Sequence, residues 1–149
     1  MMGEFQDADE VARAAAPFIA PECRAAVQAQ GRFVLAVSGG RTPRQMLRAL
    51  ASEGVPWHGV HVLQVDERIA PADHTDRNLT HLQESLLAHA PLRQDQVHAM
   101  PVEDGELAAA AVRYARTLED LAGSPPVLDL VHLGLGDDGH TASWPPGDP

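Results

Sequence analysis

The sequence has 149 residues, of which 44% are hydrophobic and 21% charged, a balance typical of one globular domain. It contains no apolar run of the roughly 18 to 20 residues that a membrane-spanning helix needs, and no signal-peptide pattern at its start. The formal net charge of -10 argues against a nucleic-acid partner, whereas a few placed arginines can still bind one small anion. We therefore expect a cytoplasmic protein with neither membrane nor nucleic-acid partners.

The first part of the chain predicts a helix, a strand and a second helix. Residues 7–30 are Ala-rich with apolar positions near helical spacing, so we expect a helix that is bent or split near Pro21. Residues 33–37, FVLAV, have the composition of a short buried strand. After a glycine turn, Thr42 is expected to cap a helix whose first position is Pro43.

The rest of the chain continues this alternation. Strands are expected at 61–66, weakly near 97–100, and at 128–135, where the residues are apolar on both faces. Helices are expected at about 79–90 and 105–121. The apolar residues expected on the buried face of the second of these helices are Leu107, Val112, Leu118 and Leu121.

Strands that alternate with helices predict an α/β fold with a doubly wound, mainly parallel sheet and flanking helices. In the common strand order 3-2-1-4, the last strand lies beside the first at the topological switch point. The sequence ends soon after this strand, so we expect residues 1–149 to be the N-terminal part of a longer domain whose sheet is incomplete on the C-terminal side. An uncovered strand edge of this kind favours pairing with another chain.

A glycine-rich turn, SGGRTP at 38–43, lies between the first strand and its helix. Its glycines let the backbone approach a ligand, and the free N–H groups at the helix start attract an anion. The residues expected to bind a phosphate are Ser38, Gly39, Gly40, Arg41 and Thr42. A tight turn with a helix cap explains the same residues without a ligand, and the turn has neither the Walker lysine nor GxGxxG spacing.

Polar residues also follow the strands at 61–66 and 128–135. Asp66-Glu67-Arg68 offers a cation for a developing oxyanion and carboxylates to orient it, although an isolated DER is more often a solvated turn. His140, in the loop GDDGH, has a side chain suited to a general base, with Gly139 beside it. The other histidines show no metal-ligand spacing, so we infer no metal.

Together, SGGRTP at 38–43, VDER at 65–68 and LGLGDDGHTAS at 133–143 resemble the 6-phosphogluconolactonase family. The resemblance implies a Rossmann-like α/β fold and hydrolysis of 6-phosphogluconolactone in the pentose phosphate pathway without a cofactor. It also implies that His140 is the general base and that Arg68 lies near the lactone carbonyl. By the same resemblance, residues 38–42 bind phosphate, with Asp66 and Gly139 as further substrate-binding residues and a small sugar phosphate lactone as the ligand.

Three alternatives stay open. A glucosamine-6-phosphate deaminase or isomerase would use the same phosphate turn, but deaminases resemble this chain only at Asp66-Glu67 and differ at Arg68 and Thr141. A non-catalytic sugar-phosphate sensor is disfavoured by the retained His140 and by the absence of a DNA-binding segment. An inactive fragment is the third possibility, because family members continue with strands that complete the pocket. The chain also departs from the family pattern at Trp144 and Pro145, and its oligomeric state is left open.

Overall fold

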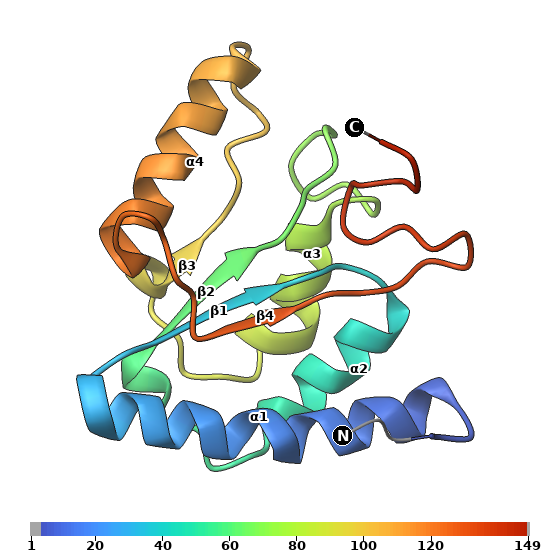
Figure 1. The fold of residues 1–149 in the computed structure, drawn as a ribbon, viewed down its shortest axis with the longest axis vertical. Coiled ribbons are helices and arrows are strands. Elements are labelled where there is room, and N and C mark those ends of the chain that lie inside the picture. Colours follow the sequence, from blue (N-terminus) through green and yellow to red (C-terminus); the bar gives the residue numbers. More distant parts are fainter. Residues whose placement is uncertain (1–3, 149) are drawn as a thin grey trace.

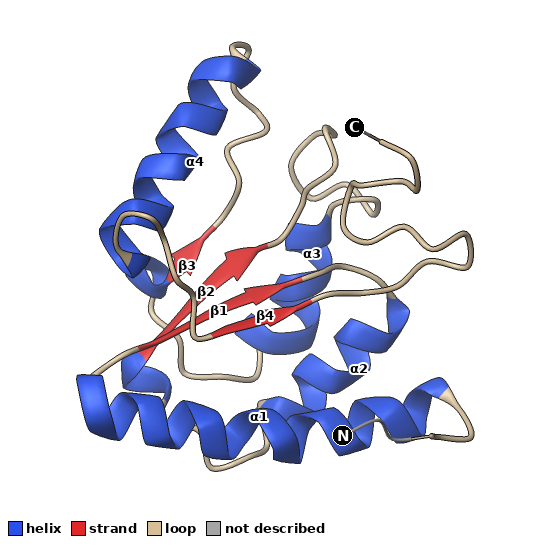
Figure 2. Ribbon diagram, viewed as in Figure 1, coloured by secondary structure: helices blue, strands red, loops and turns tan. Residues whose placement is uncertain are grey.

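The computed structural model describes residues 4–148. Its elements, in chain order, are α1 (Ala8–Gln30), β1 (Phe33–Val37), α2 (Arg41–Leu50), η1 (Trp57–Gly59), β2 (Val60–Gln64), α3 (Asn78–Leu82), the π-helical turn η2 (Gln83–Leu87), η3 (Gln94–Gln96), β3 (Val97–His98), α4 (Leu107–Ala122) and β4 (Leu130–His132). The four strands form a parallel sheet in the order β3-β2-β1-β4 (Figure 2). Helices α1, α2 and α3 pack on one face and α4 on the other (Figure 1). The predicted doubly wound fold and its strand order are confirmed.

Strand β1 lies in the middle of the sheet and is buried along its whole length. Phe33, Leu35 and Val37 pack into the core shared with α1, α2 and α3. Val34 and Ala36 point to the opposite face and pack beneath α4. This alternation is the two-residue period of a strand, and because both faces are covered, all five residues are apolar.

Helix α1 runs without interruption from Ala8 to Gln30, so of the bend or split expected near Pro21 the split is wrong. Its two internal prolines, Pro17 and Pro21, are exposed, and the apolar stripe on the other side of the helix is buried. That stripe consists of Ala12, Ala16, Ile19, Ala20, Cys23 and Val27. Packing on both sides of each proline compensates for the backbone hydrogen bond that proline removes. Within residues 4–148, neither this helix nor any other is long and apolar enough to cross a membrane.

The buried face of α4 is the expected one in part, since Leu118 and Leu121 pack against the core beneath the helix. Leu107 and Val112 are 43% and 53% exposed, whereas Ala110 and Tyr114 are buried. Tyr114 fixes this face because its hydroxyl accepts a hydrogen bond from the Gln64 backbone N–H at 3.1 Å and lies 3.1 Å from the Gln64 carbonyl oxygen. Val112 lies two positions from Ala110 and so points away from the sheet.

Strand β4 is shorter and more exposed than the expected strand at 128–135. It pairs only with β1 and forms one edge of the sheet. Val131, Leu133 and Leu135 are 47%, 53% and 82% exposed, so the expectation of burial on both faces is wrong. The core beneath α4 lies over β1 and β2 and leaves this side of β4 uncovered.

The exposed side of β4 predicts self-association of the isolated chain, because an apolar, unpaired edge strand is a template for another strand. Val131→Lys, which places a charge on that strand, is expected to reduce association. Phe18→Lys is the matched control, because Phe18 is 71% exposed on α1 and outside the sheet. Sedimentation velocity over a concentration series measures the effect. Equal association of both variants would place the contact elsewhere.

Three half-buried histidines predict that the fold is less stable in mild acid. Burial lowers the pKa of His61, His98 and His132 below the ordinary value. His61 Nδ1 and His98 Nε2 also lie 3.0 Å apart across β2 and β3, so a second proton on the pair would place two positive charges side by side. The unfolded chain therefore binds more protons below about pH 6.5, and the free energy of unfolding falls as pH decreases from there.

Urea unfolding between about pH 7.5 and pH 5.5 tests this dependence. The midpoint is expected to be constant above the ordinary histidine pKa and to fall below it. A His61→Gln/His98→Gln variant should show a shallower fall, with His58→Gln as the control because His58 is exposed. A urea midpoint that rose as the pH fell would contradict this prediction.

Candidate active site

The carboxyl ends of β1, β2 and β4 open onto a cleft of about 610 Å³. Eight of the nine residues predicted for the site line it: Ser38, Gly39, Gly40, Arg41, Thr42, Asp66, Arg68 and His140. The ninth, Gly139, is not among the lining residues; its N–H donates a hydrogen bond to the Gly136 carbonyl oxygen and shapes the turn before His140. Three loops that are distant in sequence therefore meet at one edge of the sheet.

The N-terminus of α2 faces this cleft. The helix begins at Arg41 and its N-cap is Gly40, without a side-chain cap, so the expected cap by Thr42 is wrong. Gly40 has a φ of 112°, which disfavours any residue with a Cβ atom. Because the first N–H groups of a helix have no intrahelical acceptor, those at the start of α2 are available to an anion. Pro43 occupies the first turn, where its lack of an N–H costs nothing.

Two side chains fix the turn between β1 and α2. The Ser38 hydroxyl donates to the His132 carbonyl oxygen at 3.1 Å and accepts from the Gly134 N–H at 3.3 Å, which ties the end of β1 to β4. A Cβ atom on Gly39 would lie 1.9 Å from Asn78 Oδ1. Asn78 therefore occupies the space that only a glycine at position 39 leaves open.

Asn78 also holds Asp66 at the end of β2. Its Nδ2 donates to the Asp66 carbonyl oxygen and to Asp66 Oδ1, at 3.1 and 3.2 Å. Asp66 Oδ2 accepts from the Ser143 hydroxyl at 2.9 Å, in the loop that carries His140. Asp66 thus connects two sides of the cleft, which limits its freedom to contact a ligand.

His140 is oriented by Asp138. The imidazole Nδ1 lies 2.5 Å from Asp138 Oδ1, which also accepts from the His140 backbone N–H at 3.1 Å. These hydrogen bonds hold the pKa of Asp138 below its ordinary value. An ionised carboxylate only accepts hydrogen bonds, so it favours the tautomer with the proton on Nδ1 and leaves Nε2 free as a base.

Gly136 makes room for this pair. A Cβ atom at position 136 would lie 2.2 Å from His140 Nδ1 and 2.9 Å from Asp138 Oδ1. The absence of a side chain therefore lets the imidazole lie directly against the backbone of the loop.

The cleft carries two arginines whose side chains make no hydrogen bond or ion pair within residues 4–148. Arg41 lies at the start of α2, and Arg68 follows β2. Guanidinium groups without a protein partner are suited to a phosphate or to an oxygen that gains negative charge. No cluster of three or more potential metal ligands occurs in the described part of the chain.

Comparison with known proteins identifies the family of this chain. Residues 6–149 match the family model described as glucosamine-6-phosphate isomerases/6-phosphogluconolactonase. The chain belongs to this family. It is 38% identical over 122 residues to the 6-phosphogluconolactonase of a Nostoc species, covering 79% of this chain and 51% of that protein. It is 39% identical to the Pseudomonas putida 6-phosphogluconolactonase over 146 residues, covering 98% and 58%.

The fold agrees with a solved member of the same family. The crystal structure of the 6-phosphogluconolactonase from Thermotoga maritima superposes with a TM-score of 0.83 at 26% identity, covering 93% of this chain and 61% of that one. The chain therefore spans about half to three fifths of the length of the relatives that it matches.

Sequence reasoning assigned no role to four polar residues that line this site or support the residues that do. Asp138 had a signal, since an acid two residues before a candidate base can reach its ring. Asn78, His132 and Arg77 had none, because their roles depend on contacts across the fold. His132 lines the cleft from β4, and its buried Nδ1 has no hydrogen-bond partner within the described residues.

Proposed function

We propose that this cleft takes part in the hydrolysis of 6-phospho-D-glucono-1,5-lactone to 6-phosphogluconate, a carboxylic ester hydrolase reaction of the pentose phosphate pathway. One observation carries the proposal: His140, held by Asp138, shares the cleft with Arg68 and with the free N-terminus of α2. The names of the relatives support the same reaction class. Water and the lactone are the only reactants, so the reaction requires no cofactor.

In the proposed mechanism, His140 Nε2 takes a proton from water as the water oxygen attacks the lactone carbonyl carbon. Arg68 stabilises the negative charge that develops on the carbonyl oxygen. The bond from that carbon to the ring oxygen then breaks, and the proton on His140 passes to the ring oxygen. The products are a carboxylic acid, which ionises, and an alcohol. Asp138 stabilises the imidazolium while the proton resides there.

The phosphate binds at the other end of the cleft in this proposal. The N–H groups at the start of α2 and the Arg41 guanidinium are the anion-binding groups, and the dipole of the ten-residue helix adds to their attraction. The side chain of Ser38 already has two partners, so we assign it to the shape of the turn, with Thr42 as the free hydroxyl.

The matched family model covers isomerases as well as lactonases, and Arg68 and the residues after His140 favour the lactonase reaction. Ser143 contributes to the site through Asp66, at a position where deaminases carry a different run of residues.

The rate of lactone disappearance at neutral pH, compared with the spontaneous rate, tests the proposal. Hydrolysis faster than the spontaneous rate that is lost in His140→Ala supports it. A folded protein that leaves the spontaneous rate unchanged at millimolar substrate would remove the assignment.

Arg41→Glu is expected to raise KM for the lactone by roughly 10- to 100-fold with a smaller effect on kcat, since it replaces one charge-assisted contact by repulsion. Arg48→Glu makes the same charge change at the exposed, far end of α2 and serves as the control. Steady-state kinetics separate the two constants. An unchanged KM for Arg41→Glu would place the phosphate elsewhere.

A further inference from the structure

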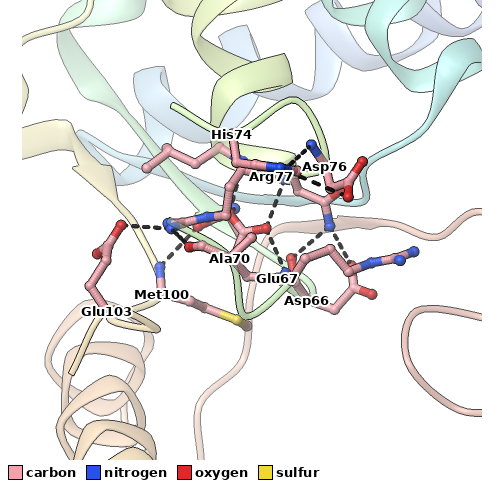
Figure 3. Close-up of polar contacts among 12 residues, drawn as sticks. Asp66, Glu67, Ala70, His74, Asp76, Arg77, Met100 and Glu103 are labelled. Carbon is pink, nitrogen blue, oxygen red and sulfur yellow. Dashed lines mark hydrogen bonds and ion pairs between the residues drawn. The ribbon is translucent and has the colours of Figure 1, made fainter. Parts of the chain in front are cut away.

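Arg77 is a charged side chain that the proposed mechanism does not use, and it is only 1% exposed. Its Nε lies 3.1 Å from Glu67 Oε2, and its Nη1 lies 2.6 Å from Glu103 Oε1 (Figure 3). Nη1 also donates to the Ala70 carbonyl oxygen at 2.8 Å. Burying a guanidinium is costly, so its position among three separate segments calls for a physical reason.

The reason lies in Glu67, which separates the two cleft residues Asp66 and Arg68. The Glu67 side chain is fully buried, is not among the residues that line the cleft, and lies toward Arg77 (Figure 3). Its Oε1 accepts hydrogen bonds from the backbone N–H groups of Arg68 and Asn78, at 2.7 and 2.8 Å. This carboxylate therefore fixes the backbone of the turn that presents Asp66 and Arg68.

Glu67 is ionised in this position. Burial raises its pKa, but hydrogen bonds from the Gln64 side chain and from three backbone N–H groups outweigh burial, so the pKa lies below its ordinary value. A buried carboxylate that keeps its charge needs a counter-charge. Two arginines are candidates: Arg77, which approaches it in the interior, and Arg68, its neighbour in the chain.

We propose that Arg77 is a positioning residue that neutralises Glu67 and thereby leaves the guanidinium of Arg68 free in the cleft for the substrate. The inference rests on the proposed function for what Arg68 does there. Without Arg77, the Glu67 carboxylate keeps its backbone hydrogen bonds but lacks a counter-charge, so it turns outward and pairs with Arg68. The Arg68 guanidinium would then no longer be free to contact a substrate in the cleft, although Arg41 would be unaffected.

Phenylglyoxal, which modifies unpaired arginines, tests the proposal by its rate of reaction at Arg68, measured by peptide mass spectrometry. Arg41 is the internal reference, because it lines the same cleft at a separate turn. In Arg77→Met we expect Arg68 to react roughly five-fold more slowly than in the wild type, the scale of one partly exposed ion pair, with Arg41 unchanged. Arg77→Met/Glu67→Gln should restore the wild-type rate, and Arg77→Lys should retain it.

A folded Arg77→Met protein with an unchanged rate at Arg68 would overturn the proposal, and so would a double variant that fails to restore the rate. If the Met variant does not fold, Arg77→Gln replaces it. Glutamine keeps a donor for the Ala70 carbonyl oxygen but carries no charge, so the same slowing is expected and an unchanged rate is again contradictory.

This measurement needs no substrate, so it separates the inference from the proposed function. If the wild type does not hydrolyse the lactone but Arg68 reacts as expected in the variants, the proposed function is wrong and the positioning role of Arg77 still holds. Where hydrolysis is measurable, Arg77→Met should lower kcat and leave KM for the phosphorylated lactone nearly unchanged. If Arg77 only stabilised the fold, its replacement would not lower kcat selectively.

Discussion

Replacement of His140 by alanine is expected to slow lactone hydrolysis by roughly 10²- to 10⁴-fold, the range for loss of a general base. The imidazole is held by Asp138 and lies against Gly136, on the surface of a loop, so its removal should leave the core unchanged. The expected loss is in kcat, because proton transfer occurs only after the lactone is bound. Initial rates and a thermal melt of the same preparation measure both effects.

His89→Ala provides the matched control, since His89 is an exposed histidine outside the cleft. It should hydrolyse the lactone at the wild-type rate. A His140→Ala protein that keeps wild-type kcat would reduce His140 to a loop residue.

Arg68→Gln is expected to lower kcat by roughly 10²- to 10³-fold, the scale for loss of one group that stabilises an oxyanion. The Arg68 side chain has no partner within residues 4–148, so the fold should lose little stability. Arg68→Lys keeps the charge without the planar fork and should recover part of the rate. Arg116→Gln, at an exposed position on α4, is the control.

Steady-state kinetics across the four proteins measure the effect. If Arg68→Gln raised KM and left kcat unchanged, Arg68 would bind the ground state of the substrate, and the developing charge would need another partner.

The sheet was predictable from the sequence because the composition of a strand indicates whether one or both of its faces need to be buried. FVLAV at 33–37 is apolar at every position, which indicates a strand covered on both faces, and the structure covers both. The same logic was wrong for residues 128–135. An apolar run indicates that a strand needs other elements packed on both faces, but it does not show that the chain supplies those elements. Helix α4 illustrates a related limit. The face that contains Tyr114 packs on the sheet, whereas the hydrophobicity of single residues favoured Leu107 and Val112, which are exposed.

The candidate site was predictable where strand ends carry glycine or charge, as in SGGRTP, DER and GDDGH. The supporting residues were not. Arginine is expected at the surface, so nothing in the sequence suggested that Arg77 is buried between Glu67 and Glu103. Nor did sequence spacing suggest that Asn78 fills the space beside Gly39.

A crystal structure of this chain with 6-phosphogluconate bound tests the central claim most directly, since the product carries both the phosphate and the carboxylate made from the lactone. The phosphate is expected at the N-terminus of α2, against Gly40 and Arg41. The carboxylate is expected between His140 and Arg68. A phosphate bound beside His140, or a product bound outside the cleft, would contradict the assignment of roles to these residues.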